Sequence, residues 1–129
     1  MRLLVDAHAL LWWLGADRSL STNARDAVEA ADDPLLSAGT LMEIAIKRSL
    51  GKLEIDEDWP EQARADGFSV LSVAWAHARR LQELPFPRLG GVLHRDPFDR
   101  LLVAQALSEG VPIVTRDPAI AAYGVGVIW

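Results

Sequence analysis

Two aspartates stand directly after short β-rich runs, where a carboxylate can take part in chemistry. Asp6 follows RLLV at 2–5, and Asp117 follows PIVT at 112–115 after one intervening arginine. An aspartate after a strand often only caps the next helix or turn, and for either residue alone this role is an equal alternative. Because both occur in one short chain, we favour a shared carboxylate site.

A third aspartate lies inside the stretch HRDPFDRLLVAQAL, residues 94–107. Pro97 suits the first position of a helix, because it has no N–H and its φ is fixed, and this makes Asp96 the N-cap. Asp99 is then the third helical residue, where complementing the helix dipole would contribute about 0.3–1 kcal/mol. Capping explains Asp96 fully, whereas the dipole explains Asp99 only in part, so Asp99 joins the candidate site.

Glu43 is a fourth acidic candidate, in the first half of the apolar helical run LMEIAIK. By pattern alone it belongs on the solvated stripe of the helix, and Lys47 four residues later offers it an ordinary surface ion pair. Lys47 and Arg48 already supply a polar edge to this helix, however. Glu43 is therefore kept as a candidate, with the surface pair as the alternative.

The elements that must position these acids alternate along the chain. β-rich and apolar runs predict strands at 2–5, 35–38, 68–73, 112–115 and 125–129. Helical spacing and stop signals predict helices at 7–15, 22–31, 40–52, 74–84, 97–109 and 118–124, with a turn and a short helix in the acidic segment 53–67. The Pro- and Gly-rich segment 85–95 is expected to be a loop.

Strands that alternate with helices predict the α/β fold class. They imply right-handed βαβ crossovers and a parallel sheet that is covered on both faces. In open sheets of this kind, binding sites form beyond the carboxyl ends of the strands. Asp6 and Asp117 follow the ends of two predicted strands, so we expect them at that edge.

Composition narrows the classes of function. The chain has 129 residues, half of them apolar, which fits one compact domain over 1–129 with a sizeable core. Cysteine is absent, which excludes thiolate metal sites and a cysteine nucleophile, and the net charge of −5 argues against a broad basic surface for nucleic acid. The apolar N-terminus contains Asp6 and His8 and is too short to cross a bilayer, so we expect no membrane anchor. The absence of cysteine is compatible with a reducing compartment, so the cytoplasm is the expected location.

Four segments occur in order and nearly fill the chain: LLVDAHALLWWL, SAGTLMEIAIKRSLGKLEI, HRDPFDRLLVAQAL and PIVTRDPAIAAYGV. Together they resemble PIN-domain ribonucleases of the VapC toxin type, the toxic half of type II toxin–antitoxin pairs. The resemblance implies a three-layer α/β/α sandwich with a central parallel sheet of strand order 3-2-1-4-5, which would bring Asp6 and Asp117 together. Met42 and Thr40 stand where relatives often have Trp and Ser, which alters packing rather than the acidic set.

The resemblance also implies a function for the acids. The set carried over by motif is Asp6, Glu43, Asp99 and Asp117, supported by the hydroxyl of Thr115. Such carboxylates suit Mg²⁺ or Mn²⁺, hard ions that prefer oxygen ligands, and a bound ion would activate water to hydrolyse an RNA phosphodiester. We expect Asp6 and Asp99 to be the principal ligands. Asp117 would be a further ligand, and Glu43 would act through water or orient the nucleophile.

The implied partners are an RNA substrate, a cognate antitoxin protein and a second copy of the chain in a homodimer. Four cations near the acids are candidates for phosphate contacts, although each alone is more readily explained as balancing a neighbouring acid: Lys47, Arg95, Arg100 and Arg116. Five tryptophans exceed what one small core needs, so some should lie at an interface. The segment 59–67 is either part of a binding clip or a plain surface helix.

Other classes of protein fit the residues less well. A receiver domain needs a closely paired acid near the start and a lysine after a late strand, where this chain has Arg116 and Asp117. A haloacid-dehalogenase phosphatase needs D-x-D after the first strand, where DAH stands. The remaining rival is a catalytically silent PIN-like module that binds RNA or protein, since a fold does not guarantee activity.

Overall fold

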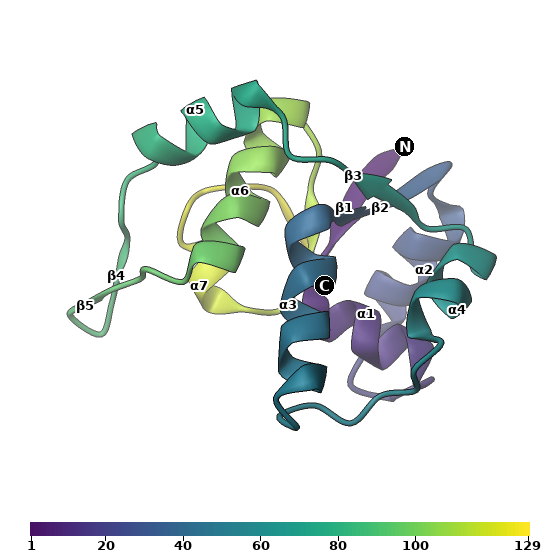
Figure 1. Ribbon diagram of the computed structural model, residues 1–129. Coiled ribbons are helices and arrows are strands. Elements are labelled where there is room, and N and C mark those ends of the chain that lie inside the picture. The colour runs from purple at the N-terminus through teal and green to yellow at the C-terminus, as the bar shows by residue number, and fades with distance from the viewer.

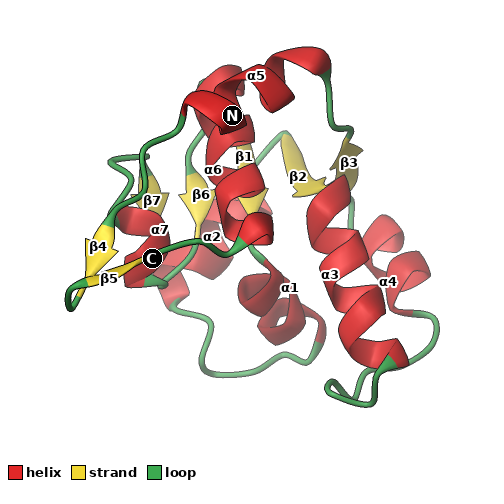
Figure 2. Cartoon of the chain, turned by 60° about the vertical axis from the view of Figure 1, so that its left-hand side comes forward, coloured by secondary structure: helices red, strands yellow, loops and turns green.

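A five-stranded parallel sheet forms the centre of the computed structural model, which describes residues 1–129. Its strands lie in the order β3-β2-β1-β6-β7, and Figure 2 shows them side by side. Their bounds are Arg2–Val5 for β1, Asp33–Ser37 for β2, Ser69–Leu71 for β3, Ile113–Val114 for β6 and Val127–Ile128 for β7. Counted along the sheet-forming strands, this order is 3-2-1-4-5, so the implied topology and the α/β class are confirmed.

Seven helices surround the sheet (Figure 1). Their bounds are Ala7–Leu14 for α1, Thr22–Ala30 for α2, Ala38–Ser49 for α3, Trp59–Ala65 for α4, Trp75–Glu83 for α5, Pro97–Glu109 for α6 and Pro118–Ala121 for α7. None of them is long and apolar enough to span a bilayer. The predicted helices are confirmed, with α6 matching its expected bounds and the others differing by a few residues at their ends.

Alternating strand residues divide the core into two apolar layers, as expected for a sheet that is covered on both faces. Leu3 and Val5 of β1 belong to the cluster with buried residues of α1, α2 and α4, whereas Leu4 belongs to the cluster with α6 and α7. All three side chains are buried. The two layers of helices hold the sheet between them, which confirms the three-layer sandwich.

Helices α3 and α6 approach each other closely at Gly39, and this approach matters for the site. A Cβ added to Gly39 would lie 2.6 Å from Cδ2 of Leu101 on α6, so any larger residue would require that side chain to move. Glu43 lies one helical turn after Gly39, and Asp99 lies in the first turn of α6. The small residue therefore lets the two helices bring these acids to one edge of the sheet.

The expectation that 85–95 is a loop was wrong. In this segment β4 (Arg88–Leu89) and β5 (Val92–Leu93) pair antiparallel across Gly90 and Gly91. Both glycines have positive φ, 58° and 82°, which suits a two-residue hairpin turn.

Strand β2 also begins earlier than predicted, at Asp33, and includes Pro34. Proline is tolerated there because β2 pairs with β3 only from Leu35 onward, so the missing N–H interrupts no bond to that strand. Ala38, expected to end the strand, is instead the first residue of α3.

Candidate active site

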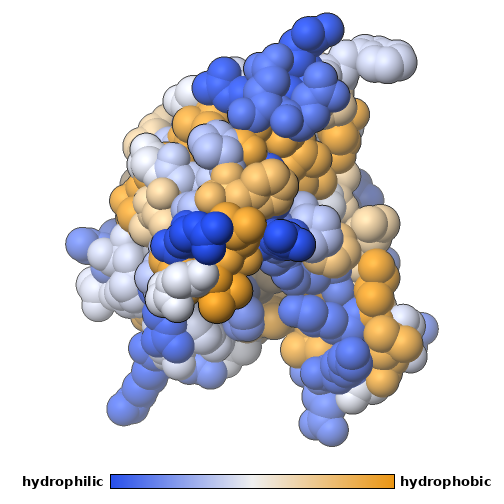
Figure 3. All heavy atoms as spheres, turned by 90° about the vertical axis from the view of Figure 1, so that its left-hand side faces the viewer, coloured by the Kyte–Doolittle hydropathy of each residue, from blue (hydrophilic) through white to orange (hydrophobic).

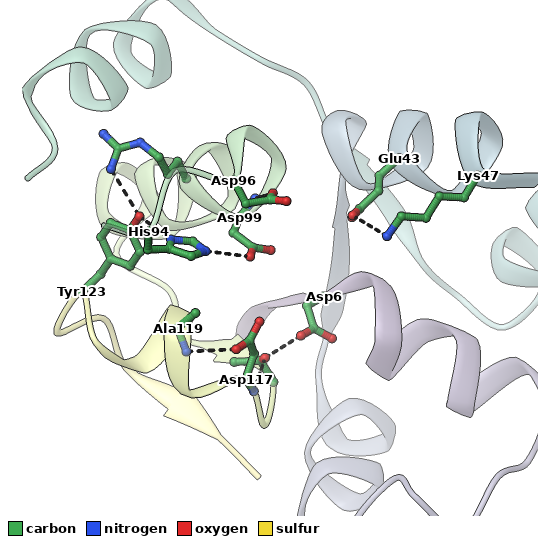
Figure 4. Close-up of polar contacts among 11 residues, drawn as sticks. Asp6, Glu43, Lys47, His94, Asp96, Asp99, Asp117, Ala119 and Tyr123 are labelled. Atoms are coloured by element: carbon green, nitrogen blue, oxygen red, sulfur yellow. Dashed lines mark hydrogen bonds and ion pairs between the residues drawn. The ribbon is translucent and has the colours of Figure 1, made fainter. Parts of the chain in front are cut away.

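A cavity of about 130 Å³ lies where the carboxyl ends of β1 and β6 meet the first turns of α1, α3 and α6. Its lining contains five carboxylates: Asp6, Glu43, Asp96, Asp99 and Asp117. Figure 4 shows these side chains converging from segments that are far apart in the sequence. The four acids selected from the sequence therefore share one cavity, and the N-cap Asp96 joins them.

Asp6 both caps the helix that follows β1 and contributes a carboxylate to the acidic cavity. One carboxylate oxygen caps α1 by accepting a hydrogen bond from the backbone N–H of Ala9 at 2.8 Å. The other accepts a hydrogen bond from the hydroxyl of Thr115. Burial raises the pKa of Asp6, and the bonds from Thr115 and Ala9 oppose that rise. Asp6 is thus a buried carboxylate with both oxygens held in place.

Thr115 connects the ends of the two central strands. Its hydroxyl donates to Asp6 of the β1 end and accepts from the backbone N–H of Asp117 at 3.0 Å. Asp117 in turn caps α7 by accepting from the N–H of Ala119 at 2.9 Å. The pairing of β1 with β6, through Leu4 with Ile113 and Val5 with Val114, makes this link possible.

Asp96 and Asp99 have the local roles that the helix pattern predicted. Asp96 is the N-cap of α6 and accepts from the N–H of Asp99 at 2.9 Å. The Asp99 carboxylate accepts from Nε2 of His94 at 3.2 Å. Burial, followed by repulsion from Asp96 and Asp117, raises the pKa of Asp99 to about 6, against the opposing effect of His94. The carboxyl group of Asp99 is therefore harder to ionise than that of a free aspartate. Complementing the helix dipole does not by itself explain an acid at this position.

Glu43 forms the predicted surface ion pair and also lines the acidic cavity. It forms an ion pair with Lys47 at 3.0 Å, as the i, i+4 spacing predicted, yet its side chain is only 13% exposed. Both residues line the acidic cavity. Lys47 is thus the cation placed directly at the carboxylates.

The remaining predicted cations differ in their surroundings. Arg116 is exposed and lies over the ring of Trp12 at 4.4 Å. Arg95 is exposed and forms no ion pair. Arg100 is only 6% exposed, and its guanidinium donates to the backbone carbonyls of Leu84 and Pro85. Arg100 is therefore unsuited to contact phosphate, and this expectation is corrected.

A second recess, of about 340 Å³, adjoins the acidic cavity and shares Asp6, His8 and Asp117 with it. Its other lining residues are Trp12, Arg116 and Pro118. His8 is exposed and lies beside Trp12, with ring centroids 5.8 Å apart. The sequence reasoning gave His8 no role, although its position two residues after Asp6 was a usable signal.

The acidic cavity fits a hard divalent cation by its donor chemistry. Its charged donors are carboxylate oxygens. Burial, and then repulsion from neighbouring acids, raises the pKa of both Asp6 and Asp99, so the carboxylates gathered here are costly to ionise without a cation. No group of three acidic or histidine side chains lies close enough together to hold an ion by itself. An ion in this cavity would therefore be held by one or two carboxylates together with water, as Mg²⁺ commonly is in proteins.

Comparison with known proteins gives consistent results. A family model described as PIN domain matches residues 3–126. Ribonuclease VapC22 of Mycobacterium tuberculosis (strain ATCC 25618 / H37Rv) is 29% identical over 128 residues, which cover 94% of this chain and 91% of that protein.

Solved structures share the fold at low sequence identity. VapBC2 from Rickettsia felis, bound to a DNA fragment from its promoter, has a TM-score of 0.70 at 13% identity and covers 98% of this chain and 97% of its own. A toxin–antitoxin complex from Klebsiella pneumoniae has a TM-score of 0.65 at 21% identity, with 98% and 96% covered. FitAcB from Neisseria gonorrhoeae has a TM-score of 0.64 at 17% identity, with the same coverage.

Neutralising Asp99 should stabilise the metal-free protein at neutral pH. Because the pKa of Asp99 in the folded protein is raised, its charge destabilises the fold above about pH 6, and this penalty disappears below the unfolded value near 4. Asp99→Asn should raise the free energy of unfolding by about 1 kcal/mol at pH 7.5, after allowance for solvent at this partly exposed group, and by nothing at pH 4. Chemical denaturation in EDTA measures both values.

Asp96 provides the matched control on the same helical turn. Asp96→Ala should lower the free energy of unfolding, because loss of an N-cap costs about 0.5–2 kcal/mol. Asp96→Ser removes the same charge but keeps a capping oxygen, so the difference between these two variants isolates the cap. If Asp99→Asn destabilises the protein at pH 7.5 as Asp96→Ala does, Asp99 serves the helix and not a strained acidic site.

Proposed function

The chain belongs to the PIN domain family, and from this premise we propose that it is a metal-dependent ribonuclease toxin of a type II toxin–antitoxin pair. The observation that carries the proposal is the single cavity shared by Asp6, Glu43, Asp99 and Asp117. The name of the ribonuclease from M. tuberculosis and the toxin–antitoxin complexes among the structural relatives support it. We propose the cytoplasm as the place of action, since the substrate is cellular RNA.

We assign the acids to roles by their surroundings. Asp6 and Asp99 would be the principal ligands of Mg²⁺ or Mn²⁺, with Asp117 as a further ligand and Glu43 acting through water. The bound ion would supply an activated water and neutralise charge that develops on the phosphate. Thr115 holds the Asp6 carboxylate in place, and Lys47 balances Glu43 beside the cavity.

The recess beside the acids is the natural place for a neighbouring nucleotide of the substrate. Single-stranded RNA is commonly held by stacking on aromatic rings and guanidinium planes together with a few phosphate contacts. His8, Trp12 and Arg116 offer these groups next to Asp6 and Asp117. Arg116, with support from Arg95 and Lys47, would thus bind RNA locally, which agrees with a chain whose net charge is −5.

A catalytically silent module that binds RNA or protein is the second candidate function. Such a module would have no need to gather four carboxylates into one cavity against their mutual repulsion. Burial, with repulsion from neighbouring acids as a further cause, raises the pKa of both Asp6 and Asp99, and this cost favours a cation-binding, catalytic role.

A homodimer and an antitoxin complex would use apolar surface that the fold leaves exposed. Met42, Ile46 and Leu50 recur at a spacing of four along α3, and all three are exposed. Of the five tryptophans, Trp59 is buried in the core, whereas Trp75 is 95% exposed. On the side that carries α5 and the hairpin, Figure 3 shows apolar patches below the hydrophilic surface of α5.

The position of Trp59 bears on the segment 59–67. Its helix, α4, packs Trp59 and Ala63 into the core. This anchorage favours the simpler of the two earlier alternatives, a surface helix that belongs to the fold, over a separate binding clip.

The first test of the proposed function is metal-dependent cleavage. Purified protein without antitoxin should cut RNA in Mg²⁺ or Mn²⁺ and leave 5′-phosphate ends, and excess EDTA should abolish the activity. Asp6→Asn, Asp99→Asn and Asp117→Asn should each lose at least about a hundredfold in kcat, the scale on which groups that stabilise transition-state charge act.

Asp26→Asn on α2, an exposed aspartate outside the cavity, is the control and should cut RNA normally. Undiminished cleavage in EDTA would rule out the metal mechanism. Binding of Mn²⁺ and RNA without any cleavage would instead support the silent module.

The second test concerns Arg116. Arg116→Gln should raise KM for RNA while leaving kcat little changed, and should reduce the slope of log affinity against log salt by about 0.7, the value for one phosphate contact to a single strand. Arg79→Ala, which removes an exposed arginine on α5, should change neither quantity. An unchanged KM and slope in Arg116→Gln would mean that Arg116 only covers Trp12.

The third test concerns assembly. Light scattering at micromolar concentration should give twice the chain mass of 14.1 kDa. Leu50→Glu should shift the protein toward monomer, because a charge on the exposed apolar stripe of α3 opposes burial. Lys52→Glu, two residues away and outside the stripe, should remain dimeric. A monomeric mass for the wild type would contradict the homodimer.

A further inference from the structure

A chain of hydrogen bonds runs from a buried arginine to the acidic cavity. Arg100 donates to the hydroxyl of Tyr123 at 3.2 Å, and that hydroxyl lies 2.7 Å from Nδ1 of His94. Nε2 of His94 lies 3.2 Å from the carboxylate of Asp99. Figure 4 shows His94 between Tyr123 and Asp99, with its ring edge pointing at the acid. None of these three residues, Arg100, Tyr123 and His94, was assigned such a role from the sequence.

The donors and acceptors in this chain point in one direction. An arginine side chain can only donate, so the Tyr123 oxygen accepts from Arg100 and its own proton is free to be donated to His94. Nδ1 of His94 then accepts, which leaves the imidazole proton on Nε2. From there it is donated to Asp99, and the order Arg100, Tyr123, His94, Asp99 is a consistent series of donors.

The arginine end of this hydrogen-bonded series is anchored. The Arg100 guanidinium donates to the carbonyls of Leu84 and Pro85 at 2.9 and 3.0 Å and lies 3.7 Å from the ring centroid of Phe86. It has no carboxylate partner. This buried cation is therefore held by backbone dipoles and ring faces, and cannot swing toward Asp99.

The hairpin places His94. The backbone N–H of His94 donates to the carbonyl of Pro87 at 2.9 Å, which closes the base of the β4–β5 hairpin. The His94 ring also meets the Tyr123 ring edge to face, with centroids 5.5 Å apart and planes at 77°. The imidazole is thus fixed in position by the hairpin and in orientation by Tyr123.

We propose that His94, held in its Nε2–H tautomer by Tyr123 and Arg100, is the positioning residue that presents the Asp99 carboxylate to the metal cavity. This proposal rests on the proposed function. His94 binds one oxygen of Asp99 and so selects the rotamer in which the other oxygen is available. Its N–H also favours the charged carboxylate against the repulsion of Asp96 and Asp117, both of which line the same cavity.

Variants of His94 and Tyr123 test this role. His94→Leu removes the donor, whereas His94→Gln keeps an amide N–H for Asp99 and a carbonyl for Tyr123. Tyr123→Phe removes only the hydroxyl and keeps the ring. The matched control is His77 of α5, a buried histidine that contacts Glu109 at the opposite end of α6 at 3.1 Å. His77→Gln and His77→Leu repeat the same chemical changes far from the cavity.

Two readouts are measured on folded protein, checked by circular dichroism. The first is the ¹⁵N NMR spectrum of the His94 ring in the metal-free protein, which should show the Nε2–H tautomer in the wild type and lose that preference in Tyr123→Phe. The second is the dissociation constant for Mn²⁺ from calorimetric titration. It should rise about 10- to 100-fold in His94→Leu, as for other residues that orient metal ligands, and less in Tyr123→Phe. His94→Gln and both His77 variants should remain near the wild type.

Three results would overturn this proposal. An Nδ1–H tautomer in the wild type overturns it, as does wild-type affinity for Mn²⁺ in His94→Leu. Equal losses in folded His94→Gln and His94→Leu would also overturn it, because a positioning donor must be rescued by an equivalent donor. A wild-type protein that binds no Mn²⁺ and cuts no RNA would instead overturn the proposed function, a result that the His94 variants cannot produce.

Discussion

Repulsion among carboxylates gathered at one edge of the sheet is the constraint that the surrounding structure must accommodate. The strand order brings the ends of β1 and β6 together, and the Gly39 contact brings α3 against α6, so five acidic side chains line one small cavity. Burial of the carboxylates, together with repulsion between their like charges, opposes ionisation, and both effects raise the pKa of Asp99. A folded state that keeps this arrangement must offset the repulsion with positive charge or dipoles.

Helix N-termini provide much of that offset. Asp6, Asp96 and Asp117 are the N-caps of α1, α6 and α7, and Asp99 lies in the first turn of α6. The three N-caps each accept a hydrogen bond from a backbone N–H of the first turn. All four residues lie at the positive end of a helix dipole. Capping and a role in chemistry are therefore compatible for these residues, because the capping bond itself orients the acid. Lys47, His94 and the hydroxyl of Thr115 complete the set of groups that hold the carboxylates.

Much of this arrangement was predictable because its signals are local. The run RLLV ending at Asp6, and Pro97 placing Asp96 as N-cap, depend on a few neighbouring residues, and β1 and α6 were predicted correctly. The pairing of β1 with β6 was implied by the resemblance to a family, since periodicity alone does not determine strand order.

The errors arose where one local signal masked another, and where packing between residues far apart in the sequence determines the structure. Gly90 and Gly91 form a tight turn, but the prolines and glycines around them made the whole segment look like loop. Arg100 is next to Asp99 in sequence, yet one step along a helix rotates a side chain by about 100°, and Arg100 instead contacts Leu84, Pro85 and Tyr123. The contact of His94 with Tyr123 joins residues 29 positions apart, and no local pattern predicts it.

The most direct measurement of the central claim is anomalous X-ray diffraction from crystals of the protein grown with millimolar Mn²⁺. We expect a manganese peak within coordinating distance of Asp6 and Asp99, with Asp117 and Glu43 as further or water-mediated contacts. Crystals of Asp6→Asn grown in the same way should lack that peak. A well-ordered cavity with no manganese peak in the wild type, or a peak bound only by acids elsewhere, would contradict the account.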